Sequence, residues 1–172
     1  MENCNPIIID VEASGFGKGS YPIEVGFALP DRTTRCFLIQ PHDGWVHWNE
    51  EAENIHGIQR DTLLEKGQPI DEVVGQLNYF LANKTVYSDG WCNDLSWISL
   101  LFDVANLRMN FSIESLNVLL SEDQFQLWGK TRDRVQSDMG LKRHRASSDA
   151  LIIQETFMRT MGHVERKVTG TV

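Results

Sequence analysis

The segment Pro6-Ile-Ile-Ile-Asp-Val-Glu12 constrains the fold of this chain more than any other part of the sequence. It is mostly apolar and β-branched, and a Ser-Gly-Phe-Gly-Lys-Gly turn follows it, so it is predicted to be a buried strand. Side chains two apart on a strand point to the same face, which places Asp10 and Glu12 side by side where the strand leaves the core. Such a pair is either solvated at a strand end or bound to a divalent cation such as Mg²⁺ or Mn²⁺, because neighbouring carboxylates otherwise repel each other.

The rest of the chain predicts an α/β fold. Alternating apolar residues favour strands over 21–29 and 33–39, joined by a Pro-Asp-Arg turn, which completes a three-stranded antiparallel meander. Helical spacing follows over 49–56, 70–81, 94–107, 112–120, 122–137 and 146–161, with a further short strand over 85–88 and a polar, frayed tail from Gly162. One mixed sheet flanked by helices accounts for this order.

Composition narrows the class of protein. The chain has 172 residues, 41% apolar and 23% charged, which suits one domain with a buried core. Its 16 basic and 24 acidic residues give a formal net charge of −8, which argues against nucleic-acid binding through a broadly basic surface. An enzyme with carboxylates at its centre remains compatible with this balance.

The sequence also predicts a compartment. The longest aliphatic run near the start covers only residues 7–9, so we expect neither a signal peptide nor a membrane span. The cysteines Cys4, Cys36 and Cys92 are widely spaced and lack metal-knuckle spacing. Three reduced thiols in a cytoplasmic protein are therefore expected.

A second candidate for chemistry is His144-Arg-Ala-Ser-Ser-Asp149. Ser147 or Ser148 is expected to cap the last helix, which places Asp149 in its first turn and His144 just before it. An imidazole titrates near neutrality and can act as a general base toward a water molecule. The alternative is a surface histidine between two arginines.

The third candidate is Ser88-Asp-Gly-Trp-Cys-Asn-Asp94, where a strand ends and a helix begins. Asp94 is either a helix N-cap or a fourth acid, and Asp89 and, more weakly, Asp103 compete for the second role. Four carboxylates and one histidine are what two-metal hydrolysis of a phosphodiester requires.

These motifs together resemble the DnaQ-like (DEDDh) 3′–5′ exonucleases. Asp10-Val-Glu-Ala-Ser-Gly15 with Ile23-Glu-Val-Gly26 is similar to their first motif, and His56-Gly-Ile58 to a segment after the third strand. Residues 86–98 are similar to the second motif, and residues 144–150 match the third, His-x-Ala-x-x-Asp-Ala. The resemblance runs in order from residue 7 to 161, which predicts an exonuclease domain over 1–161 and a C-terminal tail over 162–172.

The resemblance implies an RNase H-like fold: a mixed five-stranded sheet with antiparallel first three strands, flanked by helices. It implies removal of nucleotides from the 3′ end of RNA or single-stranded DNA, with release of nucleoside 5′-monophosphates. Asp10, Glu12, Asp94 and Asp149 would hold two Mg²⁺ or Mn²⁺ ions, and His144 would deprotonate the attacking water.

The resemblance also implies residues that bind the terminal nucleotide. These would be Ala13, Ser14, Gly15, Phe16 and His56. Phe16 would stack on or wedge beside a base, or is an ordinary turn aromatic. His56 would contact the terminal sugar or phosphate, or caps its short helix.

The second motif departs from the family pattern. Ser88 and Asp89 stand where relatives have histidine and asparagine, and the loop is one residue longer. Asp94 is preferred as the metal ligand because the residues after it continue as an amphipathic helix. The usual threonine of the first motif is Ser14, which keeps the hydroxyl.

The sequence suggests a path for the substrate and leaves two other functions open. Basic residues gather just before the third motif, where they would contact phosphates or form a solvated loop: Lys130, Arg132, Arg134, Lys142, Arg143 and Arg145. Small members of the family work as homodimers, so a homodimer is plausible by analogy. The alternatives are an RNase H-type endonuclease and a catalytically silent nucleic-acid- or protein-binding module on the same fold.

Overall fold

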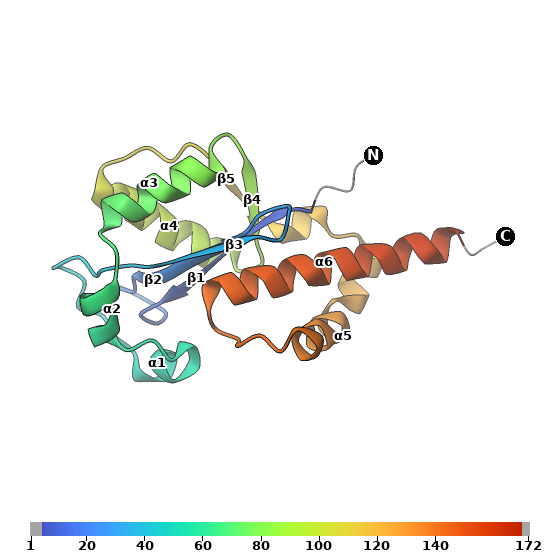
Figure 1. Cartoon of the computed structure of the whole chain (residues 1–172), viewed down its shortest axis with the longest axis horizontal. Helices are drawn as coiled ribbons and strands as arrows, with labels where there is room; N and C mark the ends of the chain where they lie inside the picture. The colour runs from blue at the N-terminus through green and yellow to red at the C-terminus, as the bar shows by residue number, and fades with distance from the viewer. Residues whose placement is uncertain (1–4, 170–172) are drawn as a thin grey trace.

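The computed structural model describes residues 5–169, with side chains to residue 162. A mixed five-stranded sheet has the order β3-β2-β1-β4-β5 and carries helices on both faces (Figure 1). The strands are β1 (Ile7–Ala13), β2 (Pro22–Ala28), β3 (Thr34–Leu38), β4 (Thr85–Ser88) and β5 (Ser112–Ser115). The helices are α1 (Glu50–His56), α2 (Arg60–Lys66), α3 (Ile70–Leu81), α4 (Trp91–Ala105), α5 (Glu122–Met139) and α6 (Ala146–Thr169), with a 3₁₀ turn η1 (Leu116–Leu119).

The direction of the strands places the site. The first three strands pair antiparallel, as expected, whereas β4 pairs parallel to β1 and β5 parallel to β4. Because parallel strands end at the same edge of a sheet, the acids that end β1 lie near the junction between β4 and α4. Two segments about eighty residues apart in the sequence therefore meet at one edge.

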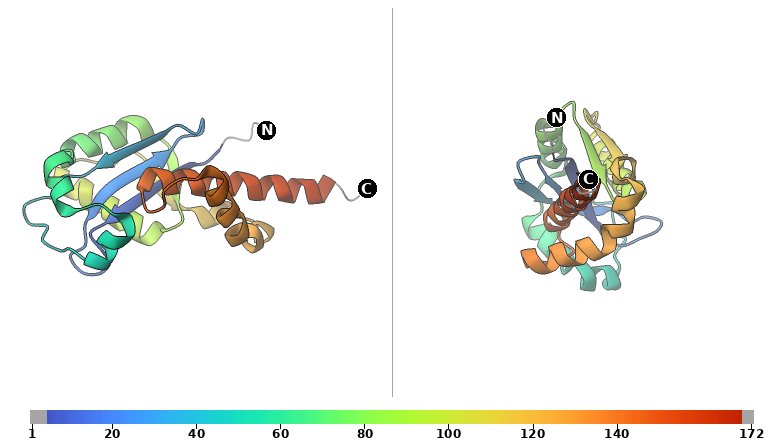
Figure 2. Two further views of the ribbon diagram at one scale, coloured as in Figure 1. Left: turned by 60° about the horizontal axis from the view of Figure 1, so that its bottom comes forward. Right: turned by 90° about the vertical axis from the view of Figure 1, so that its right-hand side faces the viewer.

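The alternation of β1 explains which face holds the acids. Ile7, Ile9 and Val11 point into the core under α3 and α4, whereas Ile8 packs under α6. Asp10 shares the face of Ile8, since side chains two apart on a strand point the same way. The face that carries the acids is thus the face covered by α6, and α6 begins above it and runs past the sheet beside α5 (Figure 2).

Two parts of the secondary structure differ from the expectation. The helix expected over 112–120 is wrong: the segment forms β5 and the turn η1, because Ile113 is buried beside β4 between the exposed Ser112 and Glu114. Helix α2 was not anticipated, since Leu63 is its only buried residue in the described chain.

Helix ends also shift. Helix α4 begins at Trp91, so Asp94 lies inside the first turn rather than at the cap. Helix α6 continues beyond Met161 to Thr169, so most of the expected tail is helical and the remainder, 170–172, lies outside the described residues.

The described cysteines are free thiols, as expected. Cys36 is partly buried, and burial raises the pKa of its thiol to about 11, while Cys92 is exposed. Cys4 lies outside the described residues.

Gly26 allows the first turn of α6 to lie directly on β2. A Cβ at this position would be 2.2 Å from the backbone nitrogen of Ser147. Backbone atoms cannot be displaced as a flexible side chain can, so any larger residue would push α6 away from the sheet.

We therefore predict that Gly26→Ala lowers the free energy of unfolding by about 1–3 kcal/mol, the usual cost of overpacking. The matched control is Gly129→Ala, in the middle of α5, where a Cβ meets no atom within 4 Å. That substitution should raise stability by up to about 1 kcal/mol through helix propensity. Urea denaturation measures both, and wild-type stability of Gly26→Ala would contradict the close contact.

Candidate active site

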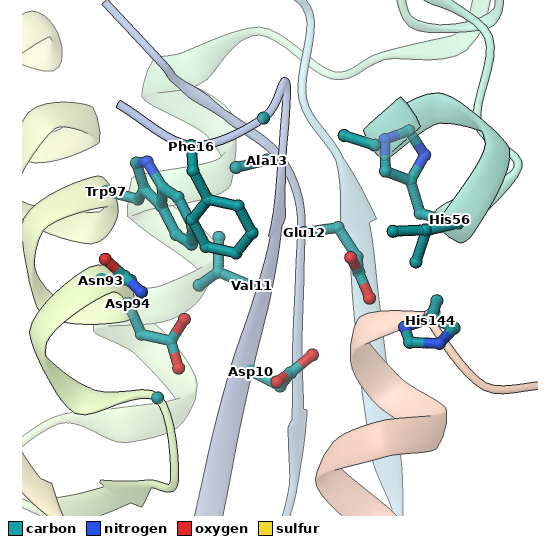
Figure 3. A pocket seen from close by; sticks show the side chains of 14 residues that line it. Asp10, Val11, Glu12, Ala13, Phe16, His56, Asn93, Asp94, Trp97 and His144 are labelled. Carbon is teal, nitrogen blue, oxygen red and sulfur yellow. The ribbon is translucent and has the colours of Figure 1, made fainter. Parts of the chain in front are cut away.

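The acids and histidine singled out in the sequence meet at one end of the sheet. A pocket of about 310 Å³ is lined by Asp10, Glu12, Asp94 and His144. Asp94 approaches from α4 on one side of β1 and His144 from the loop just before α6 on the other, with Asp10 between them (Figure 3). Glu12, His144 and Asp149 each offer a ligand atom, and these atoms lie within 4.8 Å of one another.

The electrostatics of the pocket favour a positive charge. Burial, followed by repulsion from Asp94 and Glu12, raises the pKa of Asp10 well above its ordinary value. Burial raises the pKa of Glu12 to about 7, and Asp149 adds to the shift. Burial and mutual repulsion therefore favour the protonated forms of both carboxyl groups unless a cation lies beside them.

Asp94 shows the same effect with one opposing contribution. Burial raises its pKa to about 7, while a hydrogen bond donated by the Ser88 hydroxyl to Asp94 Oδ2 lowers it. Ser88 thus holds one oxygen of this carboxylate at the edge of the pocket. Asp89, the competing acid, instead pairs with Arg132 at 3.0 Å and is not among the residues that line the pocket. Asp103 is exposed on α4.

The contacts of the two carboxylate oxygens of Asp149 indicate whether the residues of the site suit a metal ion. Its Oδ2 accepts a hydrogen bond of 2.9 Å from the backbone N–H of His144. Its Oδ1 is buried and has no hydrogen-bond partner among the described residues. A buried carboxylate with one oxygen fixed and the other unpartnered is costly unless a cation binds it. Oxygen ligands of this kind suit Mg²⁺ and Mn²⁺, so the donor set fits these metals.

The start of α6 is capped differently from the expectation. Ser147 and Ser148 lie inside the first turn, so neither is the cap. The carboxylate of Glu24, on β2, accepts the backbone N–H of Ala146 at 2.8 Å and also binds Arg145. Glu24 was visible in the sequence only as part of the Ile23-Glu-Val-Gly26 segment. No local pattern relates it to a helix more than a hundred residues later.

The turn after β1 forms one wall of the pocket. Ala13, Gly15 and Phe16 line it, and Phe16 is 75% exposed with its ring centroid 5.9 Å from that of Trp97. Ser14 is buried behind this wall: its Oγ accepts the Tyr21 N–H at 3.1 Å and lies 3.0 Å from His47 Nδ1. Trp97 and His47 were not among the expected site residues.

The opposite wall holds His56 with an unpartnered donor. His56 is buried, and its Nδ1 accepts the backbone N–H of Ile58 at 3.0 Å. Burial lowers the pKa of the imidazole, so the ring is neutral at pH 7 and its proton lies on Nε2. Nε2 has no partner among the described residues, and His56 lines the pocket. The C-cap of this helix is Gly57, so the alternative interpretation, that His56 caps the helix, is wrong.

Comparison with known proteins identifies the fold. No protein-family model and no curated protein sequence matches the chain. Among solved structures, E. coli exonuclease I in complex with a dT13 oligonucleotide matches with TM-score 0.67 and 12% identity, covering 95% of this chain and 42% of that one. The zinc-bound form of the E. coli exonuclease I–single-stranded DNA complex gives TM-score 0.67 and 12% identity over 94% and 41%. The RNase domain of yeast Pop2 gives TM-score 0.63 and 15% identity over 94% and 78%.

This likeness confirms the expected RNase H-like fold with its mixed five-stranded sheet. The chain spans about two fifths of the exonuclease I chains that it matches. In the described part of the chain, no helix has the length and apolar character needed to cross a membrane.

The raised pKa values predict a pH dependence of stability in metal-free protein. Between the ordinary value of 4.5 for Glu12 and its folded value of about 7, the folded state binds more protons than the unfolded state. Stability therefore falls as pH rises through this window, and Glu12 should contribute a loss of about 1–3 kcal/mol between pH 5 and pH 8. Urea denaturation in chelator measures it.

Glu12→Gln should show a smaller loss than the wild-type protein, whereas Glu65→Gln, at an exposed position on α2, should behave as the wild type. Addition of Mn²⁺ at pH 8 should restore stability, because ligands that bind only the folded state stabilise it. Equal pH dependence in Glu12→Gln and the wild type would contradict the electrostatics of the pocket.

Proposed function

We propose that the chain is a metal-dependent 3′–5′ exonuclease of the DnaQ-like (DEDDh) type, which shortens RNA or single-stranded DNA from the 3′ end and releases nucleoside 5′-monophosphates. The observation that carries the proposal is the convergence of Asp10, Glu12, Asp94 and His144 at one pocket, where the three carboxylates have raised pKa values. Asp149 adjoins this group, since a ligand atom of Asp149 lies within 4.8 Å of ligand atoms of Glu12 and His144. The fold shared with exonuclease I bound to single-stranded DNA supports it.

The chemistry assigns a role to each residue. Asp10, Glu12, Asp94 and Asp149 would hold two Mg²⁺ or Mn²⁺ ions, which offset the charge of the scissile phosphate and favour deprotonation of water. His144, at the mouth of the pocket, accepts the proton of the attacking water. Its backbone N–H is bound to Asp149, so the base and a metal ligand are fixed relative to each other.

The two walls of the pocket suit the terminal nucleotide. Phe16 offers an exposed ring, supported by Trp97, on which the base stacks. The Nε2–H of His56 donates to an oxygen of the terminal sugar or phosphate from the opposite wall. Ala13 and Gly15 belong to the same wall as Phe16, while Ser14 holds the turn in place.

The strand behind the terminal nucleotide would follow exposed basic side chains, which are Lys130 and Arg134 on α5 and Lys142 and Arg143 before α6. Arg132 and Arg145 already bind carboxylates of the protein. A homodimer and a cytoplasmic location stay predictions from the sequence.

The activity is tested with 5′-labelled RNA, single- and double-stranded DNA and very short oligonucleotides in Mg²⁺ or Mn²⁺. We expect progressive shortening from the 3′ end of RNA or single-stranded DNA, no activity in chelator, and loss by a factor of about 100 or more in Asp10→Asn and Asp94→Asn, since both would ligate metal. Asp89→Asn is the matched control for Asp94→Asn and should retain activity.

Circular single-stranded substrate separates the alternatives, because only an endonuclease cuts it. Cleavage of circles would replace the exonuclease proposal by an RNase H-type endonuclease. Binding without shortening of any substrate would identify a silent binding module instead.

The aromatic wall gives a separate prediction. Phe16→Ala should raise KM because base stacking contributes about 1–3 kcal/mol per base, which corresponds to roughly 5- to 150-fold. Tyr79→Ala is the matched control: this ring is 76% exposed, but it lies on α3, away from the pocket. Steady-state kinetics on the preferred oligonucleotide decides, and equal KM values in both variants would remove Phe16 from the binding site.

A further inference from the structure

Glu24 is a fully buried carboxylate that lies beside the site and is not among the residues that line the pocket. It lies on β2, directly opposite Glu12 in the antiparallel ladder, and the two share the face of the sheet that α6 covers. A buried carboxylate is costly unless hydrogen bonds and an opposite charge compensate it. The groups that compensate Glu24 indicate what the residue does.

Those groups come from two consecutive residues that directly follow His144. Arg145 Nε donates to Oε1 and Oε2 of Glu24 at 3.0 and 3.1 Å, and Nη2 donates to Oε1 at 2.5 Å. The backbone N–H of Ala146 donates to Oε2 at 2.8 Å. Charge-assisted bonds of this kind, made by a planar guanidinium, restrict orientation as well as position. Glu24 thus holds the side chain of one residue and the backbone of the next.

His144, the residue just before Arg145 and Ala146, has a backbone conformation that needs support from its neighbours. His144 has φ 59°, in the left-handed region, where a non-glycine residue costs about 1–2 kcal/mol. It follows a loop that begins at Gly140, the cap of α5, and its own N–H is bound to Asp149. The segment between α5 and α6 therefore reaches the pocket in a conformation that the following residues must maintain.

We propose that Glu24 is a positioning residue that fixes the imidazole of His144 at the pocket by holding Arg145 and the N-terminus of α6. The proposal rests on the proposed function for the role of His144 itself. It differs from a purely structural role, because Gly26 already allows α6 to lie on β2 whether or not Glu24 is charged. Glu24 acts through His144 and has no contact with the substrate.

The main test is a double-mutant cycle at saturating Mn²⁺ on the oligonucleotide that the wild type degrades. Glu24→Gln keeps the size of the side chain and should lower kcat by about 10–100-fold, with KM changed less than about twofold. In a His144→Ala background the same substitution should lower kcat by less than about threefold, because its effect passes through His144. The matched control is Glu155→Gln, an acid on α6 that also pairs with arginines, and it should leave kcat unchanged.

A second readout does not depend on activity. Hydrogen exchange of the metal-free protein should accelerate in Glu24→Gln over residues 141–150 and remain unchanged in β1. Arg145→Lys, which keeps the charge and loses the planar fork, should give an intermediate loss of kcat.

Wild-type kcat in folded Glu24→Gln would overturn the proposal. The same loss of kcat from Glu24→Gln in the wild-type and His144→Ala backgrounds would also overturn it, because it would indicate a general effect on stability. If Glu24→Gln does not fold, Arg145→Lys decides, and wild-type kcat in that variant overturns it. If the wild-type protein degrades no substrate, the proposed function fails, and unchanged exchange over 141–150 would then overturn the positioning role separately.

Discussion

The carboxylates of Asp10, Glu12, Asp94 and Asp149 repel one another at a pocket that also partly removes them from water. Both effects raise the pKa values of Asp10 and Glu12, and burial raises the pKa of Asp94, so without a cation the folded chain carries an electrostatic cost at neutral pH. The gathering of four acids from a strand and two helices is therefore unfavourable unless something offsets this cost. Under the proposed function, this constraint would let a chain of net charge −8 act on an anionic polymer, because bound cations would reverse the sign of the charge locally.

The framework around the acids provides the rigidity that such a cluster needs. β1 is the central strand and its apolar residues are buried on both faces, so Asp10 and Glu12 project from a strand that is packed on both sides. The third motif is held less directly, by the contact of α6 with Gly26 and by the bonds of Glu24.

The sequence predicted the features that depend on local pattern. The three antiparallel strands and the bounds of α3 and β4 follow from period and apolar content, and the positions of Asp10 and Glu12 follow from the alternation of β1. The sequence did not predict elements whose apolar pattern is short, or contacts between residues that are distant along the chain. β5 has one buried residue, too few to distinguish a strand from a helix, and α2 has the same weakness. The cap of α6 was assigned to nearby serines, whereas it comes from Glu24, 122 residues earlier.

The proposed hydrolysis is tested most directly with ¹⁸O-labelled water. The metal-loaded protein is incubated in this water with single-stranded RNA or DNA, and the products are analysed by mass spectrometry. Attack of water on phosphorus with cleavage of the P–O3′ bond predicts one ¹⁸O in the 5′-phosphate of each released mononucleotide and none in the shortened strand. Label in a 3′-phosphate, or no mononucleotide released from any 3′ end with Mg²⁺ or Mn²⁺, would contradict it.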